Sequence, residues 1–427
     1  MASLQREYAI VVFGASGFTG QFVVREVAKN CRGQFKWAVA GRNQGKLEKV
    51  LRETANEMDR DLTDEAHIII ADVNDEESLN IMCSRAKIIL NCVGPYRFYG
   101  EPVVKAAVEN QCHHLDVSGE PEFLETMQLK YHDQALQNNV HVIGTCGFDS
   151  IPADMGVVFA TEQFPGELCQ LESFMTFHTG PKGFVGHYGT YQSIIHGIAS
   201  NFEGNLKKIR RQIYPSPMPT FGPKLKKRGA VFYSNEINKW CIPFLGSDVS
   251  VVRRSQRHRV QVLKENAIQY GAYMGLPSLV AILLLMFFGA IFALLCRFQW
   301  GRNLLEKHPR FFSFGMFSHE GPTKQQREET SFSFLFCGAG YGKKTAGLRP
   351  LPAKPDSQIV VKVNGPEAGY VATPICMVQA AMTILEDKLP NKGGVLTPAA
   401  AFSGTSLIDR LNKNGVKFSV VSTTLAE

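Results

Sequence analysis

The sequence lacks the usual marks of a secreted or disulfide-stabilised protein. Its ten cysteines are scattered along 427 residues, and no two of them stand at CxxC spacing. The polar N-terminal residues MASLQREY lead directly into an apolar strand-like run, so the pattern of a signal peptide is missing. We therefore expect reduced thiols and a protein that faces the cytosol.

Signs of a repeat protein or a nucleic-acid reader are also missing. No self-similarity recurs at a fixed period of 20 to 50 residues. The net charge is +7, but basic residues are not interleaved with aromatic ones in the manner of RNA-binding surfaces. We expect no nucleic-acid partner, and the location of the basic residues must explain the charge.

The histidines do not form a metal-binding pattern. His178, His187 and His196 recur every nine residues, which fits neither an HExxH helix nor a compact ligand loop. His113 and His114 are neighbours in a strand-like run, so they point to opposite faces and cannot hold one ion together. The sequence therefore predicts no metal site.

The first 150 residues alternate short apolar runs with amphipathic stretches. Strands are predicted at 8–14, 36–41, 67–72, 87–94, 113–118 and 141–147, with helical periodicity between them. Such alternation is typical of βαβ units, whose parallel sheet is buried on both faces. The fold class is therefore α/β, with an N-terminal Rossmann-type sheet.

A glycine-rich loop, VVFGASGFTG, follows the first predicted strand. Gly14 permits the tight turn, Gly17 lets the backbone approach a pyrophosphate, and Gly20 allows close packing of the next helix. The free N–H groups of the helix start would bind phosphate oxygens. We predict a dinucleotide site that also includes Ser16, Phe18 and Thr19; a tight turn without ligand is the alternative.

The ends of the next two strands indicate which dinucleotide binds. An NAD site usually has an acidic residue after the second strand, whereas this sequence has Gly41 and Arg42. A guanidinium matches a 2′-phosphate, so NADP (NADPH) is favoured, NAD remains an alternative, and a solvated Arg42 is the non-binding interpretation. Asp72, after the third strand, either contacts adenine or caps the next helix.

Candidate catalytic residues follow the fourth and sixth strands. Gly94 and Pro95 close the fourth strand and would border the nicotinamide, and Tyr96 could donate a proton to the reacting group or serve a structural role. Asp149 after the sixth strand is a second candidate acid or base, with helix capping as the alternative.

Several motifs together resemble a known family. VVFGASGFTGQ, AVAGRN, NCVGPYRFYGEPVVKA, DVSGE and GFDSIPADMG, in this order, are similar to the saccharopine dehydrogenase-like oxidoreductases of animals, which are related to bacterial trans-acting enoyl reductases. The resemblance implies an NADP-binding Rossmann domain over 1–155, an α+β substrate domain over 156–360 and a C-terminal segment, 361–427, that returns to the first domain. It also implies that Pro95 and Tyr96 border the substrate.

The resemblance extends to the substrate side. The loop before Gly189 is similar to the substrate domain of the reductases, which would place His187 and Thr190 at the cleft. The segment GVLTPAAAF has alanines where relatives tend to have a charged residue, so saccharopine itself is a doubtful substrate.

One long segment has no charge at all. Residues 266–296 are uncharged, and the strongest part, 279–296, would form a helix of about 27 Å, close to the hydrocarbon thickness of a bilayer. Basic residues flank both ends, so they do not determine the orientation of a span. Because the resemblance returns the C-terminal segment to the first domain, both flanks should lie in one compartment. We therefore expect a helix or hairpin that dips into one leaflet, broken near Gly275 and Pro277 or at Gly289, with a membrane span or a buried core helix as the alternatives. The basic runs 206–211 and 224–228 would then contact acidic head groups.

These observations together predict an NADP-dependent oxidoreductase with a hydrophobic membrane-associating insertion in its second domain. Its acceptor would be a lipid-borne or small-molecule substrate, such as an acyl or glycolipid precursor, at the surface of a lipid droplet or the endoplasmic reticulum. Mitochondrial association and a homodimer both stay open. The competing hypothesis is a non-catalytic scaffold or cofactor sensor on lipid surfaces.

Overall fold

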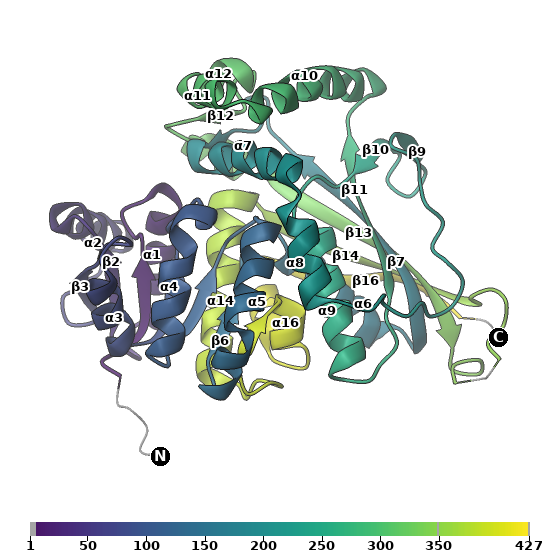
Figure 1. The fold of residues 1–427 in the computed structure, drawn as a ribbon, viewed down its shortest axis with the longest axis horizontal. Coiled ribbons are helices and arrows are strands. Elements are labelled where there is room, and N and C mark those ends of the chain that lie inside the picture. The colour runs from purple at the N-terminus through teal and green to yellow at the C-terminus, as the bar shows by residue number, and fades with distance from the viewer. Residues whose placement is uncertain (1–5, 348–349, 426–427) are drawn as a thin grey trace.

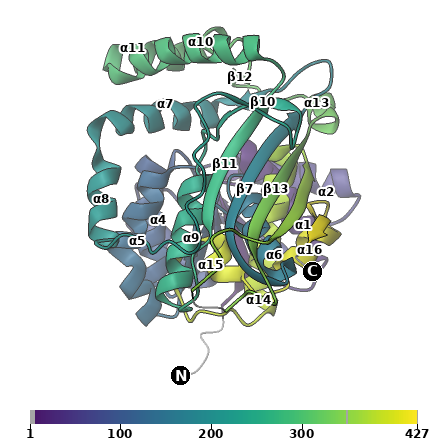
Figure 2. The same ribbon diagram turned by 90° about the vertical axis from the view of Figure 1, so that its right-hand side faces the viewer.

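Two seven-stranded sheets form the framework of the protein (Figures 1 and 2). The computed structural model describes residues 6–347 and 350–425. The first sheet lies among the N-terminal helices, and the second, more strongly curved sheet forms the other half of the molecule.

The first sheet is parallel, with the strand order β15-β6-β5-β4-β1-β2-β3. The six strands β1 to β6 confirm the six predicted apolar runs. The seventh strand, β15, comes from the C-terminal part of the chain and pairs with β6. The strands are β1 Tyr8–Phe13, β2 Trp37–Gly41, β3 Ala66–Ile70, β4 Ala86–Asn91, β5 His113–Asp116, β6 His141–Ile143 and β15 Gly394–Leu396.

Helices cover both faces of this sheet, as continuous apolar strands require. In α1, Val23, Val24 and Val27 are fully buried because their spacing of one, three and four residues directs them to the same side. The helices of this half are α1 Phe18–Cys31, α2 Gln44–Met58, α3 Glu76–Arg85, α4 Tyr96–Glu109, α5 Pro121–Gln137 and, from the C-terminal part, α14 Thr373–Glu386, α15 Pro398–Phe402 and α16 Leu407–Lys413.

The second sheet is mixed and has the order β16-β14-β13-β7-β11-β10-β9. β11 is parallel to β7, while the other neighbours are antiparallel. The strands are β7 Gly166–His178, β9 Phe232–Ser234, β10 Lys239–Pro243, β11 Gln269–Leu276, β13 Ser331–Gly342, β14 Ser357–Pro366 and β16 Lys417–Thr424.

One hydrophobic core joins the two halves. Residues of β1 and α1 belong to the same buried cluster as residues of α6 (Ile151–Gln163), β13 and α14. Helix α6 packs on the second sheet, where Phe336 lies so close to Gly156 that a Cβ there would be 2.3 Å from the ring. The shared core holds the second sheet at the edge of the first.

A layer of helices covers the carboxyl edge of the first sheet (Figure 1). Helix α7 lies directly above that edge, and α10 lies outside α7. The elements around this layer are β8 Gly186–His187, α7 Tyr188–Glu203, α8 Asn205–Ile213, α9 Asp248–Gln261, α10 Leu279–Arg297, α11 Gln299–Lys307, α12 Pro309–Phe312, β12 Phe317–Ser318, α13 Lys324–Glu329 and the π-helical turn Ala368–Ala372.

The uncharged segment 266–296 is not one insertion. Its first part is the strand β11, which pairs with β7 and β10 through the backbone and whose side chains are largely alternately buried, so the predicted bounds of the insertion are wrong at their start. Strand β11 and the first 18 residues of helix α10 are both uncharged, so the absence of charge alone did not show where the strand ends and the helix begins. Helix α10 starts only after Pro277 and runs without a break through Gly289, where a kink was one of the expected alternatives.

Helix α10 is also not the buried core helix that the sequence left open. Two helices in the described part of the chain are long and apolar enough to cross a membrane, Leu279–Arg297 and Ala368–Glu386. The second is 78% buried and belongs to the core, whereas only 11% of the first is buried. Length and composition alone do not place α10 in a membrane, but packing leaves most of its apolar surface uncovered.

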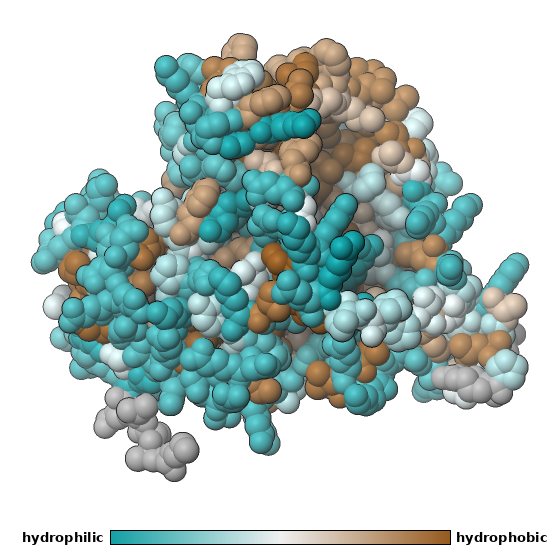
Figure 3. Space-filling view, viewed as in Figure 1, coloured by the Kyte–Doolittle hydropathy of each residue, from teal (hydrophilic) through white to brown (hydrophobic). Residues whose placement is uncertain are grey.

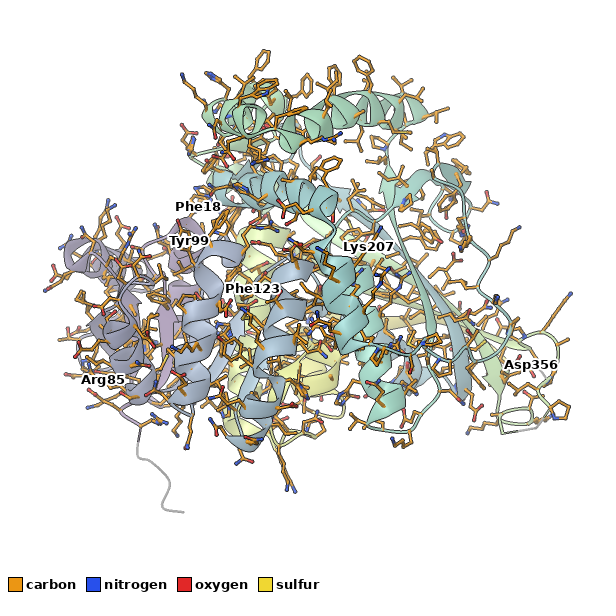
Figure 4. All side chains as sticks on the ribbon, in the orientation of Figure 1. Phe18, Arg85, Tyr99, Phe123, Lys207 and Asp356 are labelled. Carbon is orange, nitrogen blue, oxygen red and sulfur yellow. The ribbon has the colours of Figure 1, made fainter. Side chains whose placement is uncertain are left out.

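The two basic runs lie away from α10. Helix α8 descends from the end of α7 along α5, and Lys207 lies below α7 (Figure 4). Arg210 binds the Glu125 carboxylate at 2.8 Å, and Arg228 binds Glu172 at 2.8 Å. Each run thus has one arginine paired within the protein, while its other cations are exposed, and contact of these cations with head groups stays a prediction.

Candidate active site

The glycine-rich loop has the geometry of a phosphate cradle. Gly14 has a φ of +80°, and a Cβ there would lie 2.7 Å from Val93. A Cβ at Gly20 would lie 2.2 Å from the carbonyl oxygen of Gly14, so the helix can approach the turn only without a side chain. Gly17 is exposed, and α1 begins at Phe18, so the N–H groups of Phe18 and Thr19 lie in its first turn.

The end of β2 lies beside this loop. A Cβ at Gly41 would be 4.0 Å from Ser16 Oγ, which brings these two predicted contacts together. Arg42 is exposed, and its Nε lies 3.9 Å from Asp72 Oδ2, beyond hydrogen-bond distance. The N-cap of α3 is Asp75, not Asp72, so the capping alternative for Asp72 fails. The open Gly17 surface and the extended guanidinium fit a dinucleotide with a 2′-phosphate.

Tyr96 is buried at the start of α4. Its hydroxyl donates to the carbonyl oxygen of Asn91 at 2.8 Å and accepts the N–H of Val117 at 3.3 Å. Burial raises the pKa of this phenol well above its usual 10. The geometry gives Tyr96 the structural role that the sequence left open beside the catalytic one, joining the loops after β4 and β5, while Gly94 and Pro95 form the turn before it.

A buried ion pair ties this edge to α7. Glu120 binds Arg97 Nε at 2.8 Å and accepts the N–H of Tyr96 at 3.0 Å. It also accepts the hydroxyl of Ser193 at 3.1 Å, while Arg97 donates to Ser200 Oγ at 2.8 Å. The pair therefore fixes α7 above the carboxyl edge of the Rossmann sheet.

Phe18 connects the phosphate loop to the other half of the molecule. Its ring stacks on His187 at 4.5 Å with an interplanar angle of 7° and meets Tyr370 edge-on at 4.8 Å. The Tyr370 hydroxyl accepts the backbone N–H of His187 at 2.7 Å, and it also interacts with the side chain of Thr190. Phe18 and Tyr99 both lie below α7 (Figure 4).

Two residues that contact the Phe18 ring, Tyr370 and Gly321, were not predicted from the sequence. Tyr370 follows β14, far along the chain, and Gly321 lies where a Cβ would be 2.5 Å from the Phe18 ring. Neither has a motif of its own. The stacking also occupies the ring face of His187, and burial lowers the pKa of that imidazole, so His187 is suited to positioning Phe18 as a neutral ring.

Asp149 lies between the loops that follow β5 and precede α9. A Cβ at Gly119 would be 2.9 Å from Asp149 Oδ2, and one at Gly246 would be 3.5 Å from Oδ1. The N-cap of α6 is Ser150, which excludes the capping alternative for Asp149. Burial raises the pKa of Asp149 and also that of its neighbour Asp248, on which Asp149 acts by charge repulsion. A raised pKa favours the protonated form, which can act as an acid.

Metal chemistry has no visible site in the structure. Within residues 6–347 and 350–425, no group of three or more His, Cys, Asp or Glu side chains is placed to hold an ion.

Comparison with known proteins identifies the family. The saccharopine dehydrogenase NADP binding domain matches residues 10–143. Human saccharopine dehydrogenase-like oxidoreductase is 50% identical over 99% of this chain and all of its own length. The chain belongs to the saccharopine dehydrogenase-like oxidoreductases. The lipid droplet localized protein of Caenorhabditis elegans is 39% identical, covering 97% of this chain and 98% of that protein.

A solved structure supports the fold of this family member. Apo saccharopine dehydrogenase (L-Glu forming) from Saccharomyces cerevisiae aligns with a TM-score of 0.55 over 97% of this chain and 100% of that chain, at 12% identity. This likeness concerns the fold alone. The predictions of the family, of an NADP-binding domain and of an oxidoreductase are confirmed.

Proposed function

We propose that this oxidoreductase transfers a hydride from NADPH to an activated double bond of a lipid-borne acceptor, such as an acyl or glycolipid precursor. It would work on a cytosol-facing lipid surface, a droplet or the endoplasmic reticulum. The observation that carries the proposal is the stacking of layers: one helix, α7, lies between the carboxyl edge of the Rossmann sheet and the uncovered apolar helix α10. The C. elegans relative, named for lipid droplets, supports the same setting.

Some residues of the site would bind the cofactor, and others position the second half of the molecule above it. Loop N–H groups from Gly17 to Gly20 would hold the pyrophosphate, and Arg42 the 2′-phosphate. When bound, NADPH supplies the hydride. The Phe18–His187–Tyr370 contact positions the second half of the molecule above the loop, and Thr190, which is exposed beside Tyr370, would border the substrate.

Cofactor preference provides the first test. Arg42→Glu should weaken NADPH binding by about 10- to 100-fold and leave NADH binding much less affected, because a charge-assisted hydrogen bond is worth about 1.5–3 kcal/mol. Titration calorimetry with both cofactors measures this effect. Arg52→Glu, at an exposed position of the neighbouring α2, is the control and should keep the wild-type preference. Equal affinities of the wild-type protein for the two cofactors would contradict the role of Arg42.

The proton donor provides the second test. We propose Asp149 ahead of Tyr96, because the Tyr96 hydroxyl is already donated to Asn91 while the Asp149 carboxyl has a raised pKa. Asp149→Asn should lower turnover by about 10²- to 10⁴-fold, and turnover of the wild type should fall as pH rises through the pKa of this acid. Tyr96→Phe should lower stability by about 1 kcal/mol and preserve most of the turnover. The reverse ranking of the two variants would make Tyr96 the donor.

The assay also separates catalysis from the scaffold alternative. Purified protein with NADPH should consume the cofactor when fractions of a lipid extract are added. Saccharopine with NADP is the matched comparison. Rapid reduction of NADP by saccharopine, without NADPH oxidation by any lipid fraction, would refute the proposed acceptor. NADPH binding without turnover on either would favour a cofactor sensor.

A further inference from the structure

The outer side of α10 is an uncovered apolar stripe. Val280, Leu283, Phe287, Ile291 and Leu294 recur at intervals of three or four residues and are 43–65% exposed. The opposite side of the helix is covered by the protein: Ile282 and Cys296 are fully buried, and Cys296 lies in one cluster with Tyr191 and Ile195 of α7. A helix that is apolar on all sides normally has both sides covered. One side of α10 therefore lacks a partner.

The stripe continues onto the following helices. Phe288 of α10 contacts Phe314 with ring centroids 4.6 Å apart, and Phe298 stacks with Trp300 at 5.9 Å. We call the exposed apolar residues of α10, α11, α12 and the turn to Met316 the outer apolar face. Figure 3 shows hydrophobic residues gathered over this part of the molecule, and Figure 4 shows their side chains extending outward from α10 and α11.

Cationic and aromatic residues lie where this face ends. Arg297 is exposed at the end of α10, above the ring of Phe202 at 6.0 Å. Lys307 is exposed at the end of α11, and the exposed Arg310 of α12 pairs with Glu320 at 2.9 Å. Exposed aromatic rings beside cations are typical of helices that lie in the interface of a lipid layer, with the charges at the head groups.

Both ends of α10 are held by the body of the protein. Before the helix, Leu276 of β11 pairs with Trp240 of β10. After it, α11 turns back so closely that a Cβ at Gly301 would lie 2.2 Å from the carbonyl oxygen of Leu295, and Arg302 donates to the carbonyl of Cys296. Crossing a bilayer would require the helix to leave α7 and expose its buried side. The packing therefore favours a helix that lies flat.

We propose that the outer apolar face inserts into a single lipid leaflet, with α10 parallel to the surface and the cations at its end among anionic head groups. The inference rests on the lipid-surface setting of the proposed function and adds the orientation of α10 and its depth in the lipid layer. A phospholipid monolayer over an oil core would serve as well as a bilayer, because nothing in this arrangement has to reach a second leaflet.

The test compares two lipid surfaces. Full-length protein is mixed either with bilayer vesicles of phosphatidylcholine and phosphatidylserine or with triolein droplets coated by the same lipids, and bound protein is measured by flotation. We expect binding to both. Bromine atoms placed shallowly in the acyl chains should quench Trp300 more than bromine near the bilayer centre. Trp300→Phe is the blank, since it keeps the signal of the buried Trp37 and of the partly buried Trp240 on β10.

Two variants examine the face itself. Leu283→Glu with Phe287→Glu should weaken partitioning by about 100-fold or more, because two large apolar side chains are lost and two negative charges are added. Ile81→Glu on α3 is the matched control, since Ile81 is also about half exposed on a helix but lies in the Rossmann half. Circular dichroism and NADPH affinity should stay unchanged in both proteins.

Other results would overturn the inference. Binding to bilayers alone, with strongest quenching at the centre, would mean that α10 spans the membrane. A lipid-free dimer that the double variant dissociates would mean that a second copy covers the face. NADPH oxidation is measured separately. Turnover with a dispersed lipid acceptor in a protein that binds neither surface would overturn the insertion and the lipid-surface setting, and would preserve the proposed hydride transfer.

Discussion

Replacing Glu120 with alanine should lower the free energy of unfolding by about 3–5 kcal/mol, the cost of removing one partner from a buried ion pair. Glu120 is 3% exposed and binds Arg97, the N–H of Tyr96 and the hydroxyl of Ser193. These bonds connect the turn after β4 with α7. Chemical denaturation measures the loss, and NADPH affinity should fall as well, because α7 follows directly on His187, whose ring stacks on Phe18.

A second glutamate provides the matched control for this change. Glu101 binds Lys130 at 2.8 Å, but its side chain is 41% exposed, so Glu101→Ala should cost less than about 1 kcal/mol. Glu120→Gln keeps an oxygen that can accept from Tyr96 and should be intermediate. If Glu120→Ala proves as mild as Glu101→Ala, the buried pair does not hold α7.

Stability should fall as pH rises from about 4 to 8, because of carboxyl groups buried in the Rossmann half. Burial raises the pKa of Asp116 from 3.8 to about 7, against the opposing effect of N–H bonds from Ser118 and Thr145. Below the unfolded value both states are protonated and there is no cost. Above the folded value the charge is buried, which costs about 4 kcal/mol at 1.36 kcal/mol per pKa unit.

Asp116→Asn should remove much of this pH dependence. The amide oxygen can still accept both N–H groups, so the variant should match the wild type near pH 4 and exceed its stability at pH 8. Neighbouring His114 does not compensate the charge, because burial lowers its pKa to about 3. Asp75→Asn, at the exposed cap of α3, should leave the slope unchanged. A flat wild-type profile would contradict the assignment.

Local patterns were enough to predict the Rossmann strands and the phosphate loop. Each strand is a short apolar run, and the constraints on Gly14 and Gly20 come from atoms within a few residues or on the adjacent strand. The residues that contact the Phe18 ring could not be identified from such local patterns. Tyr370 and Gly321 reach that ring through the fold of the whole chain, and no periodicity records such a contact.

The start of the predicted insertion and the role of Tyr96 are two features that the sequence did not determine. In β11 the residues between Gln269 and Leu276 are all uncharged, so their alternation was hidden by the apolar helix that follows. For Tyr96 the sequence left a structural and a catalytic role open, because the direction of the hydroxyl depends on Asn91 and Val117. Hydrogen-bond partners across a loop are properties of the folded backbone.

The pairing of β15 with β6 determines when the first sheet can be completed during synthesis. Val395 lies beside Val142, so the ribosome must add about 250 residues before this partner exists. In that interval the outer edge of β6 offers unpaired backbone groups to other chains. We expect the nascent N-terminal half to depend on chaperones and to reach its final form only after β15 has been made, so that its folding depends on the C-terminal part of the chain.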